Sequence, residues 1–264
     1  MQNPVDSTPD RNQTVVVMTA GGANPQLLIN ALAPLYPKLT VIEEQPESKG
    51  LILRRRARRL GWLQAIGQLG TMIASRLGKT MSQTRATEIM ADYGVSDRSN
   101  GTVPIVHVTS LNDDACRQAV ARLQPAVIVT VSCRILSKPM LASLPCPVIN
   151  LHAGINPGYR GQMGAYWSRV ENDEANFGAT VHLVDAGIDT GGTLYEQRLV
   201  PDRKDTMLTY PLLLTAASTG IVIRAVDDAL AGRLAPYAPA GISKLRYPPA
   251  VWTWLWNGLT RRIW

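Results

Sequence analysis

The chain has 264 residues, of which 45% are hydrophobic and 18% are charged, a composition typical of a globular protein with one sizeable core. Its formal charge of +7 is largely local, because the segment Arg54–Arg59 alone holds five arginines, so nucleic-acid binding is not expected. The three cysteines are odd in number and lack C-x-x-C spacing, which argues against a disulfide framework or a zinc cluster and fits a reducing cytosol.

The N-terminal third predicts a flexible tail followed by the start of an α/β unit. Residues 1–13 lack the charged and then apolar pattern of a signal peptide, so a cytoplasmic protein is expected. Residues 14–19 form a β-branched run typical of a buried parallel strand, and residues 26–32 have a helical pattern. The turn between them contains Gly21, Gly22, Ala23 and Asn24.

This glycine-rich turn has two interpretations. Backbone amides at the start of a helix can hold an anion or a phosphate group. Alternatively, the glycines serve only the dihedral angles of a tight turn. The spacing alone leaves both interpretations open.

A basic and then uncharged segment follows a second predicted strand over residues 39–43. Residues 51–79 predict one long helix or two. The uncharged stretch 60–75 is shorter than the roughly 20 apolar residues that a spanning helix needs, so no membrane span is expected. Together with Arg54–Arg59 it suits peripheral contact with an anionic membrane. The alternative is a helical hairpin packed on the domain or on a second subunit.

The middle of the chain alternates between predicted helices and strands. Helices are expected over residues 86–93, 113–123 and 140–143, and strands over residues 103–108, 126–131 and 147–151. Asn112 or Asp113 and Ser137 are expected to cap two of these helices. The alternation predicts an α/β protein with a doubly wound, mainly parallel sheet, and places functional groups beyond the carboxyl ends of its strands.

The last part of the chain predicts a different arrangement. Residues 178–184 and 193–199 are expected to form an antiparallel pair, and residues 210–232 a long helix capped by Thr209. The domain is expected over residues 14–235, with a helical basic insertion at about 49–100. The extension 236–264 includes Trp252–Trp264, which holds four of the six tryptophans and suits either an anionic membrane or a homodimer groove.

Four polar residues are the candidates for catalysis. Asn150 and His152 lie two apart at the end of a predicted strand, so both side chains face the same way. His182 and Asp189 bracket a second strand and a glycine-rich turn. An amide can stabilise charge on a carbonyl oxygen, and a histidine near a carboxylate can take part in proton transfer.

No serine or cysteine lies in a nucleophile-elbow pattern, which favours direct acyl transfer between two bound substrates. The rival interpretation is a metal site made by His152, His182 and Asp189. For either histidine alone, a purely structural role is a third interpretation.

Several motifs of this chain resemble those of the folate-dependent formyltransferases, which include glycinamide ribonucleotide transformylase, methionyl-tRNA formyltransferase and the amino-sugar N-formyltransferases. The resemblance implies a Rossmann-like formyltransferase fold. It rests on the following ranges: 150–152 (NLH), 157–161 (PGYRG), 178–182 (GATVH), 185–191 (DAGIDTG) and, upstream, 134–137 (RILS) and 22–24 (GAN).

The resemblance implies a role for each candidate. An amine would attack the formyl carbon of 10-formyltetrahydrofolate, with Asn150 and His152 stabilising the oxyanion. Asp189 would keep His152 protonated and help to remove the proton of the amine, His182 would support the Asp189 loop, and no metal would be needed. Residues that would bind the folate co-substrate are Arg134, Ile135, Leu136, Asp185 and Ile188, and those that would bind the acceptor are Gly21, Gly22, Ala23, Asn24 and Arg160.

The departures from the family pattern concern the acceptor. The family commonly has Ser-Leu-Leu-Pro where this chain has Gly154–Pro157, and Ala23 stands where a serine is often found. Residues 236–264 are too few for the anticodon-side domain of methionyl-tRNA formyltransferase, so transfer RNA is not expected as the acceptor.

The expected function is therefore transfer of a formyl group to a primary amine of a small, phosphorylated metabolite, with a nucleotide- or lipid-linked amino sugar as the first choice. Glycinamide ribonucleotide is the alternative acceptor. A 10-formyltetrahydrofolate hydrolase or a non-catalytic folate-binding relative is the alternative of another class, because the loop behind His152 is altered.

Overall fold

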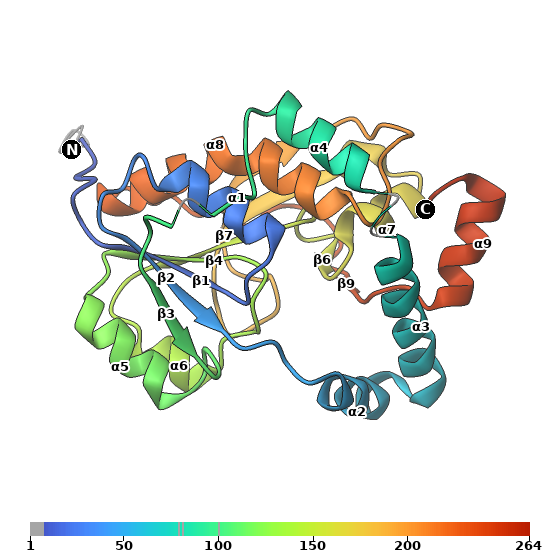
Figure 1. The fold of residues 1–264 in the computed structure, drawn as a ribbon, viewed down its shortest axis with the longest axis horizontal. Coiled ribbons are helices and arrows are strands. Elements are labelled where there is room, and N and C mark those ends of the chain that lie inside the picture. Colours follow the sequence, from blue (N-terminus) through green and yellow to red (C-terminus); the bar gives the residue numbers. More distant parts are fainter. Residues whose placement is uncertain (1–7, 79, 81, 100) are drawn as a thin grey trace.

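The computed structural model describes residues 8–78, 80, 82–99 and 101–264. Within this part of the chain, the centre of the fold is a seven-stranded sheet in the order β3-β2-β1-β4-β5-β7-β8 (Figure 1). Its strands are β1 (Val15–Thr19), β2 (Leu39–Glu44), β3 (Ile105–Val108), β4 (Val127–Thr130), β5 (Val148–His152), β7 (Gly178–Leu183) and β8 (Thr193–Arg198).

The sheet is mainly parallel, as the sequence predicts. Strands β1 to β5 pair in parallel, whereas β7 runs antiparallel to β5 and β8 antiparallel to β7. Every residue of β1 and β4 is buried, which explains their continuous apolar runs. The carboxyl ends of β1, β4 and β5 lie at the same edge, and this edge carries the polar residues singled out above.

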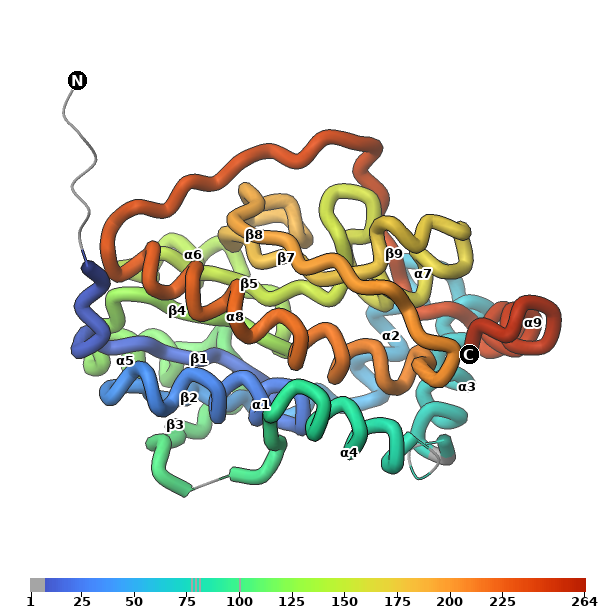
Figure 2. Tube along the Cα trace, turned by 90° about the horizontal axis from the view of Figure 1, so that it is seen from above, coloured from blue at the N-terminus to red at the C-terminus, as the bar shows by residue number. Residues whose placement is uncertain are grey.

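Helices cover both faces of the sheet (Figures 1 and 2). One face carries α1 (Ala23–Leu32), α4 (Gln83–Asp92) and α8 (Tyr210–Leu230), and the other carries α5 (Asp114–Leu123) and α6 (Lys138–Ser143). Alternate residues of β1 point to the two cores: Val15 and Val17 to the first, Val16 and Met18 to the second. The protein is therefore a three-layer α/β fold.

The region predicted as an insertion, residues 49–100, has two parts. Helices α2 (Lys49–Leu60) and α3 (Trp62–Gly78) lie at one end of the molecule, separated by Gly61, whose φ of 85° favours glycine (Figure 1). Helix α4 instead belongs to the main body, because it buries Ile89 completely in the first core. Arg85 of α4 also pairs with the buried Asp205, with 2.9 Å between Nε and Oδ1.

The C-terminal extension returns along the domain. Tyr237 forms a bridge with Thr193 at the start of β8, and β9 (Leu245–Arg246) pairs in parallel with β6 (Arg160–Gly161), which precedes α7 (Gly164–Val170). The chain then forms α9 (Val251–Arg261), which lies beside α3 in both views (Figures 1 and 2). Segments that lie far apart in the sequence thus meet at one end of the fold.

Some local predictions hold and others do not. Asp113 caps α5 by accepting from the Cys116 amide (2.8 Å), and Ser137 caps α6. Thr209 occupies the N-cap position of α8 as predicted, but its side chain makes no capping hydrogen bond, and its hydroxyl donates to Asp205 instead.

The predicted tail falls partly outside the described residues, which begin at residue 8. Within its described part, Arg11 donates two hydrogen bonds to Asp227 of α8, at 3.0 and 2.7 Å. This part of the tail is therefore held against the domain. Among the described residues, no helix combines the length and the apolar character needed to cross a membrane.

Candidate active site

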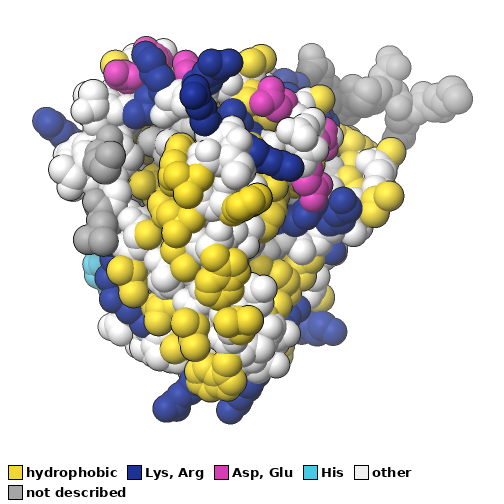
Figure 3. All heavy atoms as spheres, turned by 90° about the vertical axis from the view of Figure 1, so that its right-hand side faces the viewer, with side chains coloured by type: hydrophobic (Ala, Val, Ile, Leu, Met, Phe, Trp, Pro, Cys, Tyr) yellow, Lys and Arg dark blue, Asp and Glu magenta, His cyan; other side chains and the backbone are white. Residues whose placement is uncertain are grey.

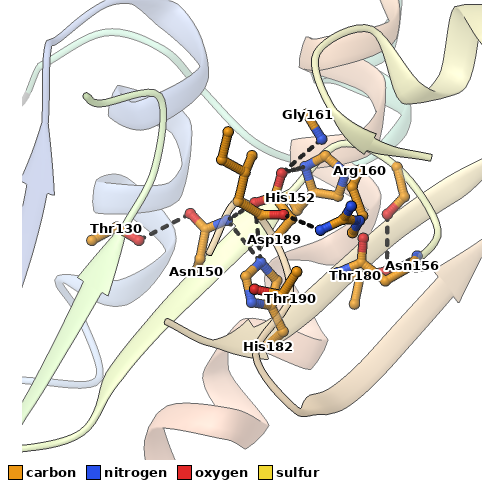
Figure 4. Close-up of polar contacts among 12 residues, drawn as sticks. Thr130, Asn150, His152, Asn156, Arg160, Gly161, Thr180, His182, Asp189 and Thr190 are labelled. Carbon is orange, nitrogen blue, oxygen red and sulfur yellow. Dashed lines mark hydrogen bonds and ion pairs between the residues drawn. The ribbon is translucent and has the colours of Figure 1, made fainter. Parts of the chain in front are cut away.

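The strand pairing brings the candidate catalytic residues together. Asn150 and His152 lie at the end of β5, and the antiparallel register of β5 and β7 places His182 directly opposite Asn150. Asp189 reaches the same point from the loop after β7, and Figure 4 shows the four side chains converging. The pairing of β5 with β7 thus brings together residues that the family resemblance groups.

The amide of Asn150 is held in one orientation. The hydroxyl of Thr130, at the end of β4, donates to Asn150 Oδ1 at 2.9 Å. Asn150 Nδ2 therefore faces His182 Nε2 (3.1 Å) and Asp189 Oδ1 (3.4 Å). Sequence reasoning missed Thr130, although a polar residue at the end of an otherwise apolar strand is a signal that could have found it.

His182 is fixed from both sides. Its Nδ1 lies 2.7 Å from the carbonyl oxygen of Leu183, so this nitrogen carries a proton and donates it. Its Nε2 lies 3.3 Å from Asp189 Oδ1. The buried ring thus lies directly against the carboxylate of Asp189.

His152 contacts protein acceptors through both ring nitrogens. Its Nδ1 lies 3.5 Å from Asp189 Oδ2, and its Nε2 lies 2.8 Å from the backbone oxygen of Tyr159. The ring is buried, with 6% of its surface exposed. In this arrangement Asn150 is better placed than His152 to donate a hydrogen bond to a substrate oxygen. The Tyr159 contact was not foreseen from the sequence.

The altered loop behind His152 explains this contact. A β-carbon on Gly154 would lie 2.5 Å from the Tyr159 oxygen and 2.7 Å from His152 Nε2. The serine that the family commonly has at this position would therefore not fit here without movement. The hydroxyl of Thr180 fixes the loop by donating to the Gly154 oxygen at 2.8 Å.

Asp189 is ionised at neutral pH. Burial by itself would raise the pKa of its carboxyl group, but the charge of His152 and hydrogen bonds from His182 and the Gly161 amide lower that pKa to about 2. Its φ of 50° lies in the left-handed region, and Arg160 helps to hold this turn by donating to the Ile188 oxygen at 3.0 Å.

The residues expected to bind the folate lie at the same edge of the sheet. Arg134 is tied to Glu44 through its backbone amide (2.7 Å) and its guanidinium (3.4 Å), so its charge is already paired. Asn112 holds the Ile135 oxygen at 3.0 Å, while the Ile135 side chain remains 59% exposed and Leu136 is buried. The backbone of this segment is therefore held in place while the Ile135 side chain remains open to solvent.

The second part of the expected folate site is the loop that contains Asp185 and Ile188. Asp185 Oδ1 accepts from the Gly187 amide (2.9 Å) and from the Thr190 hydroxyl (2.6 Å), which fixes the turn that leads to Asp189. These two hydrogen bonds thus hold the loop on both sides of Asp189.

The glycine-rich turn after β1 is less suited to a phosphate group than its sequence indicates. Gly21 and Gly22 both have positive φ angles, 76° and 107°. A β-carbon on Gly21 would lie 3.1 Å from the carboxylate of Glu43, so a negative charge stands beside the turn. Ala23 and Asn24 open helix α1, and neither side chain caps it. A carboxylate here repels an anion but accepts hydrogen bonds from hydroxyl groups.

The geometry of the cluster also bears on the rival metal site. The rival metal site would use His152, His182 and Asp189, but within the described part of the chain no group of three or more such residues has the arrangement of a metal site. A cavity of about 530 Å³ lies on the other side of Tyr159, lined by Arg246 among others, and none of the three candidate ligands lines it.

Sequence comparison links more than half of the chain to one family. The family model described as "Formyl transferase" matches residues 74–226. Methionyl-tRNA formyltransferase of Desulfotalea psychrophila is 29% identical over 133 residues, which cover 50% of this chain and 41% of the relative. The enzyme of that name from Anaeromyxobacter dehalogenans is 30% identical over 135 residues, 51% of this chain and 43% of the relative. The chain thus spans about two fifths of the length of these curated relatives.

Structural comparison finds the same fold in two kinds of formyltransferase. Glycinamide ribonucleotide transformylase 1 from Symbiobacterium toebii has a TM-score of 0.56 and 17% identity, with 90% of this chain and 96% of that chain covered. A sugar N-formyltransferase from a Shewanella species has a TM-score of 0.54 and 13% identity, with 89% and 76% covered. At these identities the likeness shows a common fold.

Proposed function

Since the chain belongs to the formyl transferase family, we propose that it transfers a formyl group from 10-formyltetrahydrofolate to the primary amine of a small metabolite. The observation that carries this proposal is the convergence of Asn150, His152 and His182 around the ionised carboxylate of Asp189. The arrangement offers a hydrogen-bond donor and a buried negative charge side by side.

Asn150 is proposed to stabilise the oxyanion. When the nitrogen of the amine bonds to the formyl carbon, the electron pair of the C=O bond moves to oxygen. Asn150 Nδ2 is proposed to donate to that oxygen in place of its long contact with Asp189 Oδ1 (3.4 Å). Thr130 holds the other end of the amide by donating to Oδ1, which keeps Nδ2 at the cluster.

Asp189 is proposed to stabilise the positive charge that the attacking amine acquires. With a pKa of about 2, Asp189 is a weak base. It therefore attracts the cationic nitrogen by its charge and does not keep the proton that this nitrogen releases. The bond between the formyl carbon and the folate nitrogen then breaks, and that nitrogen takes up a proton. The products are a formamide and tetrahydrofolate, and His152 and His182 keep the carboxylate in place.

The acceptor is proposed to be a nucleotide- or lipid-linked amino sugar. Glu43 beside the glycine-rich turn disfavours a phosphate group there and favours hydroxyl groups, and Ala23 adds no hydroxyl donor for a phosphate. Both features weigh against glycinamide ribonucleotide bound through its phosphate at this turn.

A comparison of acceptors tests the proposal. The protein is incubated with 10-formyltetrahydrofolate and, in separate reactions, with nucleotide-linked amino sugars, lipid-linked amino sugars or glycinamide ribonucleotide, and kcat/KM is measured for each. We expect the highest value for an amino sugar. A higher value for glycinamide ribonucleotide would overturn the choice of acceptor, and formate release that needs no acceptor would identify a hydrolase.

A further inference from the structure

The end of the molecule formed by α3 and α9 exposes an unusual number of large apolar side chains. Figure 3 shows them as a continuous band down this end. We call this surface the α3–α9 face and define it by the following residues: Trp62, Leu63, Ile66, Ile73, Trp252, Leu255, Trp256 and Leu259. Each of these side chains is at least 42% exposed, and Leu259 reaches 75%. Contiguous exposed apolar patches of this kind mark interaction sites.

Helices α3 and α9, which lie far apart in the sequence, pack on each other to form this face. A β-carbon on Gly67 would lie 2.4 Å from the Trp252 ring, and one on Gly70 would lie 2.9 Å from Val251. The absence of side chains at both glycines therefore lets the start of α9 pack on α3. The hydroxyl of Thr71 adds a hydrogen bond to the Pro249 oxygen at 2.8 Å.

The opposite side of each helix is occupied by the fold, so the exposed sides have a fixed direction. In α9 the buried Asn257 donates to the Tyr166 hydroxyl at 2.9 Å, while the outer residues recur at helical spacing over 252, 255, 256 and 259. In α3 the buried Ala65 and Gln68 face inward. The apolar band is therefore part of the folded structure.

The longer stretches of chain that contain α3 and α9 are strongly basic. Residues 48–87 and 229–264 together hold 14 of the 27 lysines and arginines and none of the 20 aspartates and glutamates. The rest of the chain consequently carries a negative balance. Arg54, Arg58 and Arg262 are exposed, and within the described part of the chain none of the three forms an ion pair. Arg54 and Arg58 of α2 and Arg262 after α9 thus flank the apolar face, while the rest of the chain, here called the acidic body, holds all the aspartates and glutamates.

We propose that the α3–α9 face docks on the surface of a membrane that contains anionic lipids. Tryptophan and leucine side chains suit the boundary between headgroups and acyl chains, and the arginines suit anionic headgroups. A second copy of the chain is a poorer occupant, because a two-fold interface would bring two basic segments together without an acidic partner. The acidic body would be repelled, which orients the protein.

Helix α2, which packs on α3, reaches toward the cluster around Asp189. Arg56 of α2 donates to Gln162 Oε1 at 3.3 Å, and the neighbouring Gly161 amide holds Asp189. A consequence, which rests on the proposed function, is that the acceptor is a lipid-linked amino sugar whose amine is presented at the membrane surface.

Vesicle flotation tests the docking without any use of catalysis. The full chain is mixed with vesicles of phosphatidylcholine alone or of an equimolar mixture with phosphatidylglycerol. We expect flotation with the anionic vesicles only, weakened by salt. No flotation with anionic vesicles would overturn the proposal, as would equal flotation with both.

Matched variants test which residues act. Each basic residue near an anionic surface strengthens binding by about fivefold, so changing Arg54, Arg58 and Arg262 to Gln should weaken it by about a hundredfold. The control changes Arg98, Arg122 and Arg203 to Gln, which removes the same charge from other exposed positions. An equal loss in the control would overturn the proposal, because only net charge would then matter.

A second pair of variants tests whether the exposed apolar side chains contribute to membrane binding. Trp256→Ser with Leu259→Ser should abolish flotation and the quenching of tryptophan fluorescence by brominated lipid, whereas Val200→Ser with Ile242→Ser, also exposed, should not. Thermal unfolding checks that both proteins fold. If the Trp256 and Leu259 changes instead convert a dimer to a monomer in sedimentation experiments and leave flotation unchanged, the face belongs to a second copy and the proposal is wrong.

Discussion

The cluster around Asp189 and the α3–α9 face differ in the kind of side chain that each withdraws from water or leaves in it. At the cluster, two histidines are buried and Asn150 and Asp189 are partly buried, and Asn150, His152 and His182 each contact the carboxylate of Asp189. At the face, apolar groups that usually lie in a core remain in water. Each departure needs a partner, which is internal in the first region and, as we propose, a membrane in the second. The two regions should therefore respond independently to mutation.

The largest expected effect is that of Asp189→Asn on catalysis. Asparagine has nearly the same shape and tolerates the left-handed φ, but it removes the charge that stabilises the attacking amine. We expect formyl transfer to fall by about 10³-fold, in the range of a lost acid or base group. Vesicle flotation should remain at the wild-type level, and the steady-state rate and flotation are measured on the same preparation.

A loss of flotation in this variant would show that the cluster around Asp189 and the α3–α9 face are coupled. A transfer rate within a few-fold of wild type would remove Asp189 from the reaction.

The second effect concerns the loop behind His152. Gly154→Ala places a β-carbon against the Tyr159 oxygen and His152 Nε2, so the loop must shift or the contact must break. Overpacking of this kind costs about 1–3 kcal/mol of unfolding free energy, measured by urea unfolding. Gly50→Ala, at an exposed position with open space around it, serves as the control. Equal stability of the two variants would contradict the tight packing at Gly154.

The third effect is a pH dependence of stability. Because the folded-state pKa of Asp189, about 2, lies below its ordinary value of 3.8, its contribution is complete above about pH 4 and is lost as the pH falls toward 2. The difference in unfolding free energy between wild type and Asp189→Asn should therefore shrink by about 2 kcal/mol over this range. A difference that does not change with pH would show that the carboxylate is not stabilised by the histidines.

The smallest effect is expected for Thr130→Val, which keeps the shape but removes the hydroxyl that orients Asn150. We expect kcat to fall by about tenfold, the size of one lost neutral hydrogen bond, with little change in KM. Thr130→Ser should restore most of the rate, which a purely structural role would not predict. An equal loss in both variants would contradict the positioning role.

The shared direction of Asn150 and His152 was predictable from the sequence because a strand has a two-residue period. The contact of Asn150 with His182 depends on the antiparallel pairing of β5 with β7, and β6 and α7 separate these strands in the chain. The family resemblance, and not a local pattern, groups these residues. Thr130 and the Tyr159 oxygen were not predictable in the same way, since they arrive through strand order and loop packing. Thr209 lies at the predicted N-cap position, but its hydroxyl bonds to Asp205 and makes no capping hydrogen bond.

The α3–α9 face was only partly predictable. The sequence shows an arginine cluster and a tryptophan-rich end, but it does not show that Gly67 and Gly70 dock the two segments on each other. Nor did the pattern reveal that α4, inside the expected insertion, belongs to the core through Ile89. Contacts between segments more than a hundred residues apart have no periodic signal in one sequence.

The most direct test of the account follows one carbon atom. The protein is mixed in a single turnover with 10-formyltetrahydrofolate labelled with ¹³C in the formyl group and with an amino-sugar acceptor, and the label is followed by NMR. We predict that the label appears in the formamide of the sugar in wild type and that this conversion is nearly lost in Asp189→Asn. Label that appears only as formate, at a rate independent of the acceptor, would contradict the account.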